Sequence, residues 1–259
     1  MLKKRLVGVV TIKDGWAVQS IGYRRYLPLG KPECLVENLD RWGADEILVQ
    51  VIDRSVKGQN PDFELLGRIA RLGLETPLIY GGGIHSVEDG VRAIQEGADR
   101  LVLDSMLHDA PTTIRNLSER LGAQALIAAL PLSWNGAQIE WLDYRRGTSS
   151  AISKETLSLA ETGVVSEMLL IDWKHEGFQG GFEPRLVGAF PLSDVPLIVF
   201  GGISDSSQMA ELLQMKNVSA VAVGNFLNYR EHTIQKLKEE LAAMPLRPPV
   251  YESTYLANV

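Results

Sequence analysis

The chain has 259 residues, of which 45% are hydrophobic and 22% charged, so it can bury one large core and has the usual length of a single (β/α)8 barrel. Its formal net charge of −6, without a run of Lys and Arg, argues against a nucleic-acid partner. No apolar stretch approaches the length of about 18 residues that a membrane span needs, and the charged N-terminus does not resemble a signal sequence, so we predict a cytoplasmic protein without membrane association.

Eight apolar runs recur along the chain and are separated by segments with helical periodicity. In order, they cover residues 5–12, 46–52, 77–80, 100–105, 125–130, 167–172, 196–200 and 220–224. Nearly continuous apolar strands are typical of parallel sheets that are buried on both faces. The alternation predicts one α/β domain over residues 1–259, a (β/α)8 barrel, with a doubly wound open sheet as the alternative.

Two segments depart from this alternation. Polar and apolar residues alternate around Asn135 and Gly136, which predicts a hairpin inserted on the barrel top at about residues 132–147. The Pro-rich residues from about 245 to 259 are expected to form a tail that packs on the outside of the barrel or stays loose.

Two segments also copy each other. The first is Thr76–Gly90 followed by Arg100–Leu107, and the second is Val195–Met209 followed by Ala220–Leu227. Each predicts a buried strand, a glycine turn, a helix and a second buried strand, so the barrel is expected to be a duplicated half-barrel.

Glycine turns let backbone N–H groups approach an anion, and the following helix N-terminus favours negative charge. The candidate phosphate-binding residues are Gly82, Gly83 and Ser105 in the first copy and Gly201, Gly202, Gly224 and Asn225 in the second. The alternative is that both are only tight strand-to-helix turns.

Cysteine and metal chemistry are limited because Cys34 is the only cysteine. A single cysteine excludes an internal disulfide and a cysteine-based metal cluster. No histidine has metal-ligand spacing with another histidine or with the cysteine, so we predict no metal and no cofactor. Cys34 has no nearby histidine, as a glutaminase nucleophile would need, and we expect it to pack as a small apolar side chain.

The motifs KDG at Lys13–Gly15, the paired glycine turns and NYRE at Asn228–Glu231 occur in an order that resembles the HisF family, the cyclase subunit of imidazole glycerol phosphate synthase. The resemblance covers nearly the whole chain. It implies a duplicated half-barrel, catalysis at the carboxyl ends of the strands, and a separate HisH-like glutaminase on the opposite face. The glutaminase would supply ammonia through the barrel core, and the substrate would be a phosphorylated small molecule.

The resemblance also places a charged ring at the entrance of the ammonia passage. Its members here are Arg5, Glu46, Arg100 and Glu167, and Asp99 matches a position that contacts the glutaminase. Each unpaired ion inside a barrel costs several kcal/mol, so the ring is expected to be either a salt-bridge plug or a gate. The alternative is a structural bottom layer.

The catalytic positions depart from the family. Thr11 and Pro131 stand where the family has its two catalytic aspartates, and neither side chain can serve as a general acid or base. Gln19 replaces a loop lysine and Val51 an aspartate of the second strand. At the first glycine turn, Asp104 would repel a phosphate unless it is protonated or countered by a cation.

Four acidic or basic groups remain as candidates for chemistry. Asp53 could serve only if its loop bends back, and Asp172 is expected to point into the top of the barrel. His175 and Glu176 lie in a glycine-containing segment that could close over a substrate, although a solvated loop without a catalytic role is the alternative.

These observations leave three hypotheses. The first is a diverged paralogue that delivers ammonia within a glutamine amidotransferase complex, with a sugar amidotransferase of surface polysaccharide synthesis as a possible further partner. The second is an authentic cyclase (lyase) of histidine biosynthesis in which other residues have replaced the aspartates. The third is a phosphosugar-binding barrel of another activity.

Overall fold

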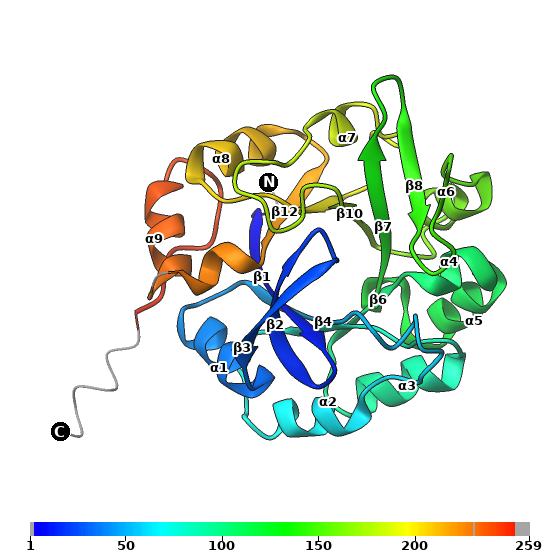
Figure 1. Ribbon diagram of the computed structural model, residues 1–259, viewed down its shortest axis with the longest axis horizontal. Helices are drawn as coiled ribbons and strands as arrows, with labels where there is room; N and C mark the ends of the chain where they lie inside the picture. Colours follow the sequence, from blue (N-terminus) through cyan, green and yellow to red (C-terminus); the bar gives the residue numbers. More distant parts are fainter. Residues whose placement is uncertain (1–2, 230, 252–259) are drawn as a thin grey trace.

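A closed barrel of eight parallel strands forms the centre of the molecule, in a computed structural model that describes residues 3–229 and 231–251 (Figure 1). Around the barrel the strands are β1 (Arg5–Lys13), β4 (Glu46–Val51), β5 (Leu78–Gly81), β6 (Arg100–Leu103), β7 (Leu126–Trp134), β10 (Glu167–Asp172), β11 (Leu197–Phe200) and β12 (Val218–Val223). Strand β12 pairs in parallel with β1 and closes the barrel. The predicted (β/α)8 barrel is therefore confirmed, and the open sheet is excluded.

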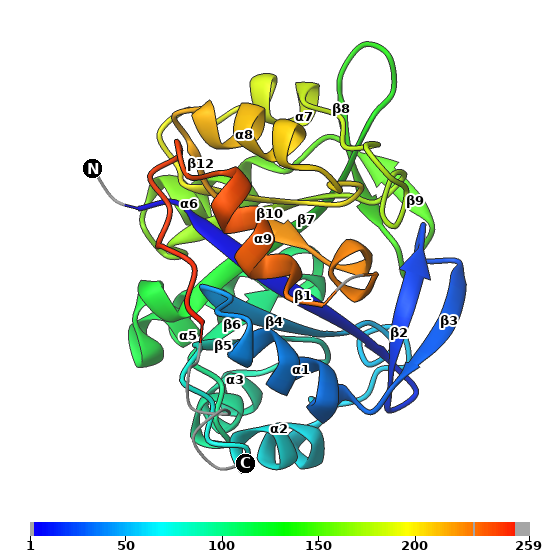
Figure 2. The same cartoon turned by 90° about the vertical axis from the view of Figure 1, so that its left-hand side faces the viewer.

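Helices surround the barrel in both views (Figures 1 and 2). They are α1 (Pro32–Arg41), α2 (Phe63–Ala70), α3 (Val87–Gln95), α4 (Ser105–Asp109), α5 (Pro111–Leu121), α6 (Lys154–Glu161), α7 (Arg185–Gly188), α8 (Ser206–Gln214) and α9 (Thr233–Glu240), with short 3-10 turns η1 (Ala123–Ala125) and η2 (Asn225–Asn228). Ser86 and Asp89 form a capping box that fixes the start of α3 after the first glycine turn. Asp205 caps α8 at the same place in the second copy. None of the helices in the described part of the chain is long and apolar enough to cross a membrane.

Strand residues alternate between two apolar layers. On β1, Val7 and Val9 point into the barrel interior, whereas Leu6 and Val10 pack outward against the helices. Because successive side chains point to opposite faces, Thr11 continues the inner row above Val9. We call the barrel interior the lumen, the carboxyl ends of its strands the upper end and their amino ends the lower end.

The two half-barrels repeat each other in backbone detail. Gly82 and Gly201 have φ of +127° and +110°, and a Cβ would lie 2.2 Å from the carbonyl oxygen of Val51 at Gly82 and 2.5 Å from that of Asp172 at Gly201. Val51 and Asp172 are the last residues of β4 and β10, so both glycines pass over the end of the equivalent strand. Only glycine fits this approach, which explains the duplicated glycine turns.

Two antiparallel hairpins extend the upper end. Strands β2 (Trp16–Ile21) and β3 (Arg25–Gly30) follow β1 through a turn in which Asp14 and Gly15 both have positive φ. Strands β8 (Ile139–Asp143) and β9 (Thr148–Ser150) follow β7, and Leu132 of β7 pairs with Trp141 of β8. The β2–β3 hairpin was not among the predicted elements.

The described part of the tail is attached to the barrel. The backbone N–H of Lys4 donates to the carbonyl of Pro245 over 2.9 Å, and the Gln235 amide donates to the carbonyl of Val250 over 3.2 Å. Arg230 of the NYRE motif and residues 252–259 of the tail lie outside the described residues.

Cys34 is exposed, so the prediction that it packs inside was wrong. On α1 the buried residues are Pro32, Val36 and Leu39, and this helical spacing leaves Cys34 on the outer face.

Candidate functional site

Four charged side chains form a closed cycle at the lower end of the lumen. Each belongs to the first residue of its strand, and each arginine bridges both glutamates. Arg5 lies 3.1 Å from Glu46 and also contacts Glu167, and Arg100 lies 2.9 Å from Glu46 and 2.7 Å from Glu167. Every charge therefore has two partners of opposite sign.

Arg5 and Glu167 stay ionised although the cycle is largely buried. The side chains of both glutamates are 8% exposed. Burial alone would raise the pKa of Glu167, but the positive charges of Arg5 and Arg100 outweigh it and lower that pKa. Burial likewise opposes the charge of Arg5, and Glu167 with Glu46 raises its pKa.

Asp99, predicted to contact a partner, is exposed at the lower end, immediately before Arg100. Its carboxylate accepts a hydrogen bond of 2.7 Å from the backbone N–H of Leu78, the first residue of β5. This contact ties the loop before β6 to the start of β5.

Above the cycle, the lumen is apolar. Its buried side chains are Val7, Val9, Leu48, Ile79, Val102, Ile127, Ala129, Leu169, Ile171, Ile198, Phe200, Ala220 and Ala222. Tyr23 and Trp173 pack against this cluster. Tyr23 comes from the turn between β2 and β3, and its hydroxyl lies 3.3 Å from the Gln50 side chain. Neither aromatic residue was predicted from the sequence, because each follows a strand and the direction of the loop after a strand is set by tertiary contacts.

A cavity of about 630 Å³ opens at the upper end. Its lining includes Tyr23 and Trp173 above the lumen, Ala129 and Ile171 from the lumen itself, and Tyr144 from the β8–β9 turn. Charged groups from Lys13, Arg24, Asp53, Lys57 and Asp104 also face it. The cavity is large enough for a small metabolite.

The two family aspartate positions lie at the top of the inner strand face. Thr11 pairs with Gln50 and Pro131 with Ile171, which places them at equivalent heights in the two half-barrels. Thr11 is 6% exposed, and Pro131 lines the large cavity. Val51 also borders this cavity, whereas the Gln19 amide contacts the Tyr229 hydroxyl.

Asp53 does reach the large cavity, because its loop bends back. It is 9% exposed, lies 2.7 Å from Lys57 and accepts a hydrogen bond of 3.2 Å from the backbone N–H of Asp14. Its Oδ1 is buried without a hydrogen-bond partner among the described residues. Lys57 also contacts Asp14, which forms a 2.6 Å ion pair with Lys13.

The first glycine turn is occupied by side chains of the chain itself. Asp104 accepts hydrogen bonds from the backbone N–H of Ser105 at 2.5 Å and from the Tyr144 hydroxyl. The Ser55 hydroxyl lies 3.4 Å from Asp104 and accepts a hydrogen bond of 3.1 Å from the backbone N–H of Gly83. Burial, together with the charge of Asp104, raises the pKa of Tyr144 well above its ordinary value, so its hydroxyl keeps the proton that it donates.

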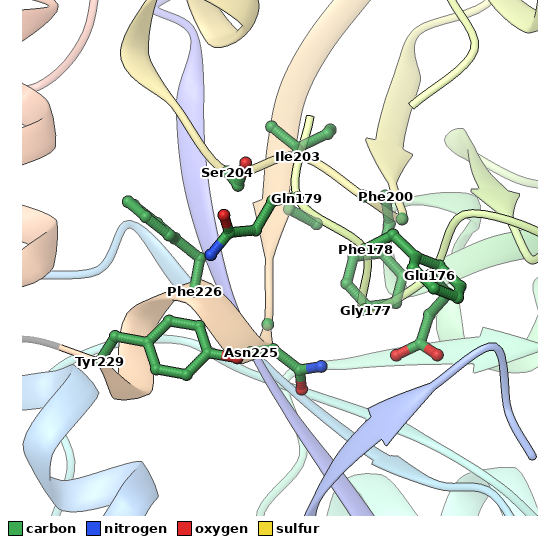
Figure 3. A pocket seen from close by; sticks show the side chains of 14 residues that line it. Glu176, Gly177, Phe178, Gln179, Phe200, Ile203, Ser204, Asn225, Phe226 and Tyr229 are labelled. Atoms are coloured by element: carbon green, nitrogen blue, oxygen red, sulfur yellow. The ribbon is translucent and has the colours of Figure 1, made fainter. Parts of the chain in front are cut away.

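A small pocket of about 30 Å³ lies at the second glycine turn (Figure 3). Gly201, Gly202, Gly224, Ser204 and Asn225 border it. Glu176 also borders it, but Figure 3 shows its carboxylate directed away from Ser204. The groups at the turn itself are neutral, although the Asn225 amide donates to the carbonyl of Ser20 and the Ser204 hydroxyl accepts a 2.8 Å hydrogen bond from the backbone N–H of Gly180.

Asp172 and His175 pair outside the large cavity. Ile171 and Trp173 line that cavity, and Asp172 instead lies on the opposite face of β10, because consecutive strand residues alternate. Its Oδ2 lies 2.7 Å from Nδ1 of His175 and accepts a 2.8 Å hydrogen bond from the backbone N–H of Glu183. Burial raises the pKa of Asp172 despite these contacts.

Glu176 fastens the β2–β3 hairpin over the barrel. It is 2% exposed and accepts hydrogen bonds of 3.0 Å from the Ser20 hydroxyl and 3.1 Å from the backbone N–H of Tyr23. The backbone N–H of Gly22 donates to its carbonyl over 2.7 Å. Glu176 thereby holds Tyr23 over the lumen.

Comparison with known proteins agrees with this architecture. The sequence model of a family described as histidine biosynthesis protein matches residues 5–233. The imidazole glycerol phosphate synthase subunit HisF of Thermococcus gammatolerans is 30% identical over 253 residues, which cover 95% of this chain and 99% of that protein. The chain belongs to the HisF family.

Other HisF relatives are similar over almost their full lengths. The subunit HisF of Geobacillus kaustophilus is 27% identical, covering 93% of this chain and 97% of that protein. A Vibrio vulnificus protein named putative imidazole glycerol phosphate synthase subunit hisF2 is also 27% identical, covering 93% of this chain and 89% of its own length.

The hairpin contact in this HisF-family chain makes stability depend on pH. Burial raises the pKa of Glu176 above its ordinary value of 4.5. The protonated carboxyl therefore contributes to the free energy of unfolding in full below pH 4.5, and this contribution is lost as the pH rises through the higher pKa of the folded state. Glutamine keeps an oxygen for Ser20 and Tyr23 but carries no charge. We therefore expect Glu176→Gln to raise the melting temperature relative to the parent increasingly as the pH rises from 4.5. A temperature difference that stays constant between acidic and neutral pH would contradict this.

Proposed function

We propose that this chain is the barrel subunit of a glutamine amidotransferase complex, in which it accepts ammonia from a separate HisH-like glutaminase and delivers it to an amination reaction. The observation that carries the proposal is a contrast between the two ends of one lumen. The lower end has a complete cycle of Arg5, Glu46, Arg100 and Glu167. The upper end has Thr11 and Pro131 where a cyclase needs an acid and a base.

The apolar lumen suits transport of neutral ammonia. An ammonium ion would have to lose its water and would find no counter-charge among the lumen side chains, which is costly in an apolar interior. Neutral ammonia carries no such penalty. In this proposal the charged cycle admits ammonia at the lower end, Asp99 contacts the glutaminase nearby, and Tyr23 with Trp173 covers the exit.

An acceptor enzyme at the upper end completes the proposal, and a sugar amidotransferase of surface polysaccharide synthesis is the candidate. Large apolar side chains are exposed on the β2–β3 hairpin, with Trp16 at 54% and Leu27 at 48%, and Tyr229 nearby is 52% exposed. The Gln19 contact joins Tyr229 to this hairpin. Such side chains at the exit support protein contact there.

The second glycine turn supplies a further part of the proposal. Gly201, Gly202, Gly224 and Asn225 are proposed to hold the phosphate of a small molecule beside α8, whose N-terminus favours an anion.

The second candidate function is an authentic cyclase of histidine biosynthesis, and Asp53 favours it. A buried carboxylate oxygen without a hydrogen-bond partner among the described residues, facing a cavity of about 630 Å³, is a candidate general base. Asp172, His175 and Glu176 support this reading less, because His175 is bound to Asp172 and Glu176 is bound to the hairpin.

One assay separates these candidates. The isolated chain is incubated with the ribonucleotide precursor of the histidine pathway and saturating ammonium salt at mildly alkaline pH, so that no partner is needed. We expect no turnover, because Thr11 and Pro131 cannot transfer protons. If the parent chain turns over the precursor and Asp53→Asn abolishes this turnover, the chain is a cyclase that uses Asp53. The matched control is Asp62→Asn, because Asp62 caps α2 and lies outside the lining of the cavity.

A further inference from the structure

We infer that Asp104 is a built-in anion that takes the place of a ligand phosphate at the first glycine turn, so that the upper cavity accepts ligands with one phosphate rather than two. The inference concerns the ligand of the proposed phosphate site and does not depend on ammonia delivery.

Asp104 and Gly224 occupy the same position in the two copies. They follow β6 and β12 directly, and their backbones are alike, with φ and ψ of −125° and −70° at Asp104 and −110° and −102° at Gly224. The glycine pairs beside them also agree, since Gly83 has φ of +73° and Gly202 has φ of +76°. The two sites therefore differ in side chains rather than in backbone.

The donors of the first site are already used within the chain. Oδ1 of Asp104 accepts the backbone N–H of Ser105, and Oδ2 accepts the hydroxyl of Tyr144. Ser55 connects Gly83 to the same carboxylate. Backbone amides and hydroxyls of this kind are the groups that bind phosphate oxygens. Here they donate to the carboxylate of Asp104 or, for the amide of Gly83, to the Ser55 hydroxyl beside it.

Tyr144 is held in this position by the inserted hairpin. Arg145 beside it forms an ion pair with Asp109 of α4, with one contact of 3.0 Å. The rings of His108 on α4 and Trp141 on β8 stack with their centroids 3.7 Å apart. These contacts fix β8 to α4, the helix that Asp104 caps. The Tyr144 hydroxyl is therefore held in place against Asp104 by the packing of the hairpin on α4.

A second phosphate would meet both a filled space and a like charge. Asp104 and Asp53 face the same cavity. Of the cations that line it, Lys57 and Lys13 are engaged with Asp53 and Asp14, and Arg24 belongs to the β2–β3 turn rather than to the first glycine turn. A ligand can instead present a hydroxyl or an amine to Asp104, which accepts hydrogen bonds. The first-turn side of the large cavity is therefore suited to neutral or cationic donors rather than to a phosphate.

The test counts inorganic phosphate sites by calorimetric titration of the whole chain. We expect one site per parent chain and two in Asp104→Ser, because serine removes the carboxylate and still caps α4. Asp104→Asn keeps the volume of the side chain and should stay at one site. Gly224→Asp copies the first turn into the second, where a Cβ would come no closer than 3.4 Å to its neighbours, and should abolish the parent's site.

The outcomes separate this inference from the proposed phosphate site. Two sites in the parent chain, or no gain of a site in folded Asp104→Ser, would overturn the role of Asp104. No site in the parent chain together with one in Asp104→Ser would overturn the second-turn site but support the inference. Ribose 5-phosphate and ribulose 1,5-bisphosphate give an independent readout: Asp104→Ser should strengthen binding of the bisphosphate about tenfold or more relative to the monophosphate.

Discussion

Replacing Arg5 with alanine is expected to uncouple the partner glutaminase from amination while the barrel stays folded. In the parent complex, nearly every glutamine hydrolysed should yield one aminated product. Arg5 supplies one contact to each glutamate of the cycle, so its loss opens one side of the lower end. We expect the ratio of aminated product to glutamate to fall about fivefold or more, which is within the usual range of coupling between sites.

The fold should survive this change because Glu46 and Glu167 each keep Arg100 as a partner. Arg5→Lys should restore coupling only in part, since one ammonium group cannot reproduce the two-sided contact of a guanidinium group. Arg68→Ala is the matched control: Arg68 also contacts two carboxylates, those of Glu33 and Glu64, but lies outside the barrel on α2. An unchanged ratio in folded Arg5→Ala would leave the cycle a structural layer.

The sequence predicts the barrel well because its strands are buried on both faces. Continuous apolar runs such as Leu169 to Ile171 are typical of parallel strands that are covered on both faces. The duplicated glycine turns mark where such strands end. The β2–β3 hairpin was missed because its outer strand is mostly exposed and carries no apolar periodicity. The clearest signal in this region was the Asp14-Gly15 turn, which joins β1 to β2 and indicates that an antiparallel strand follows β1.

The candidate site was predictable where strands position it and unpredictable where loops do. The resemblance to the HisF family predicted the cycle of charges, and residues such as Arg5 and Glu167 meet because each begins a strand of the same closed barrel. Tyr23 and Tyr144 reach the cavity from turns, and turn direction depends on tertiary contacts such as that of Glu176 with Ser20. Strand alternation, applied to β10, would have placed Asp172 on the outer face.

The second large effect is expected at Lys238, whose ammonium group is buried behind the charged cycle. Lys238 on α9 and Asp45 form a 2.8 Å ion pair in which their side chains are 2% and 1% exposed. Asp45 precedes Glu46, and its carboxylate accepts a 2.8 Å hydrogen bond from the backbone N–H of Leu6, which follows Arg5. The pair therefore fixes the first residues of two strands that contribute to the cycle.

Lys238→Met should lower the free energy of unfolding by about 3–5 kcal/mol, because it leaves the charge of Asp45 buried with only a backbone donor. Urea unfolding measures this. Lys238→Met combined with Asp45→Asn should regain part of the loss, since neither side chain then carries a charge. The control is Lys216→Met, which breaks a 3.7 Å pair with Asp194 whose side chains are 92% and 86% exposed and should change stability by less than about 1 kcal/mol. If the single and double variants lose the same stability, the effect comes from lost packing of α9, and the ion pair does not brace the lower end of the barrel.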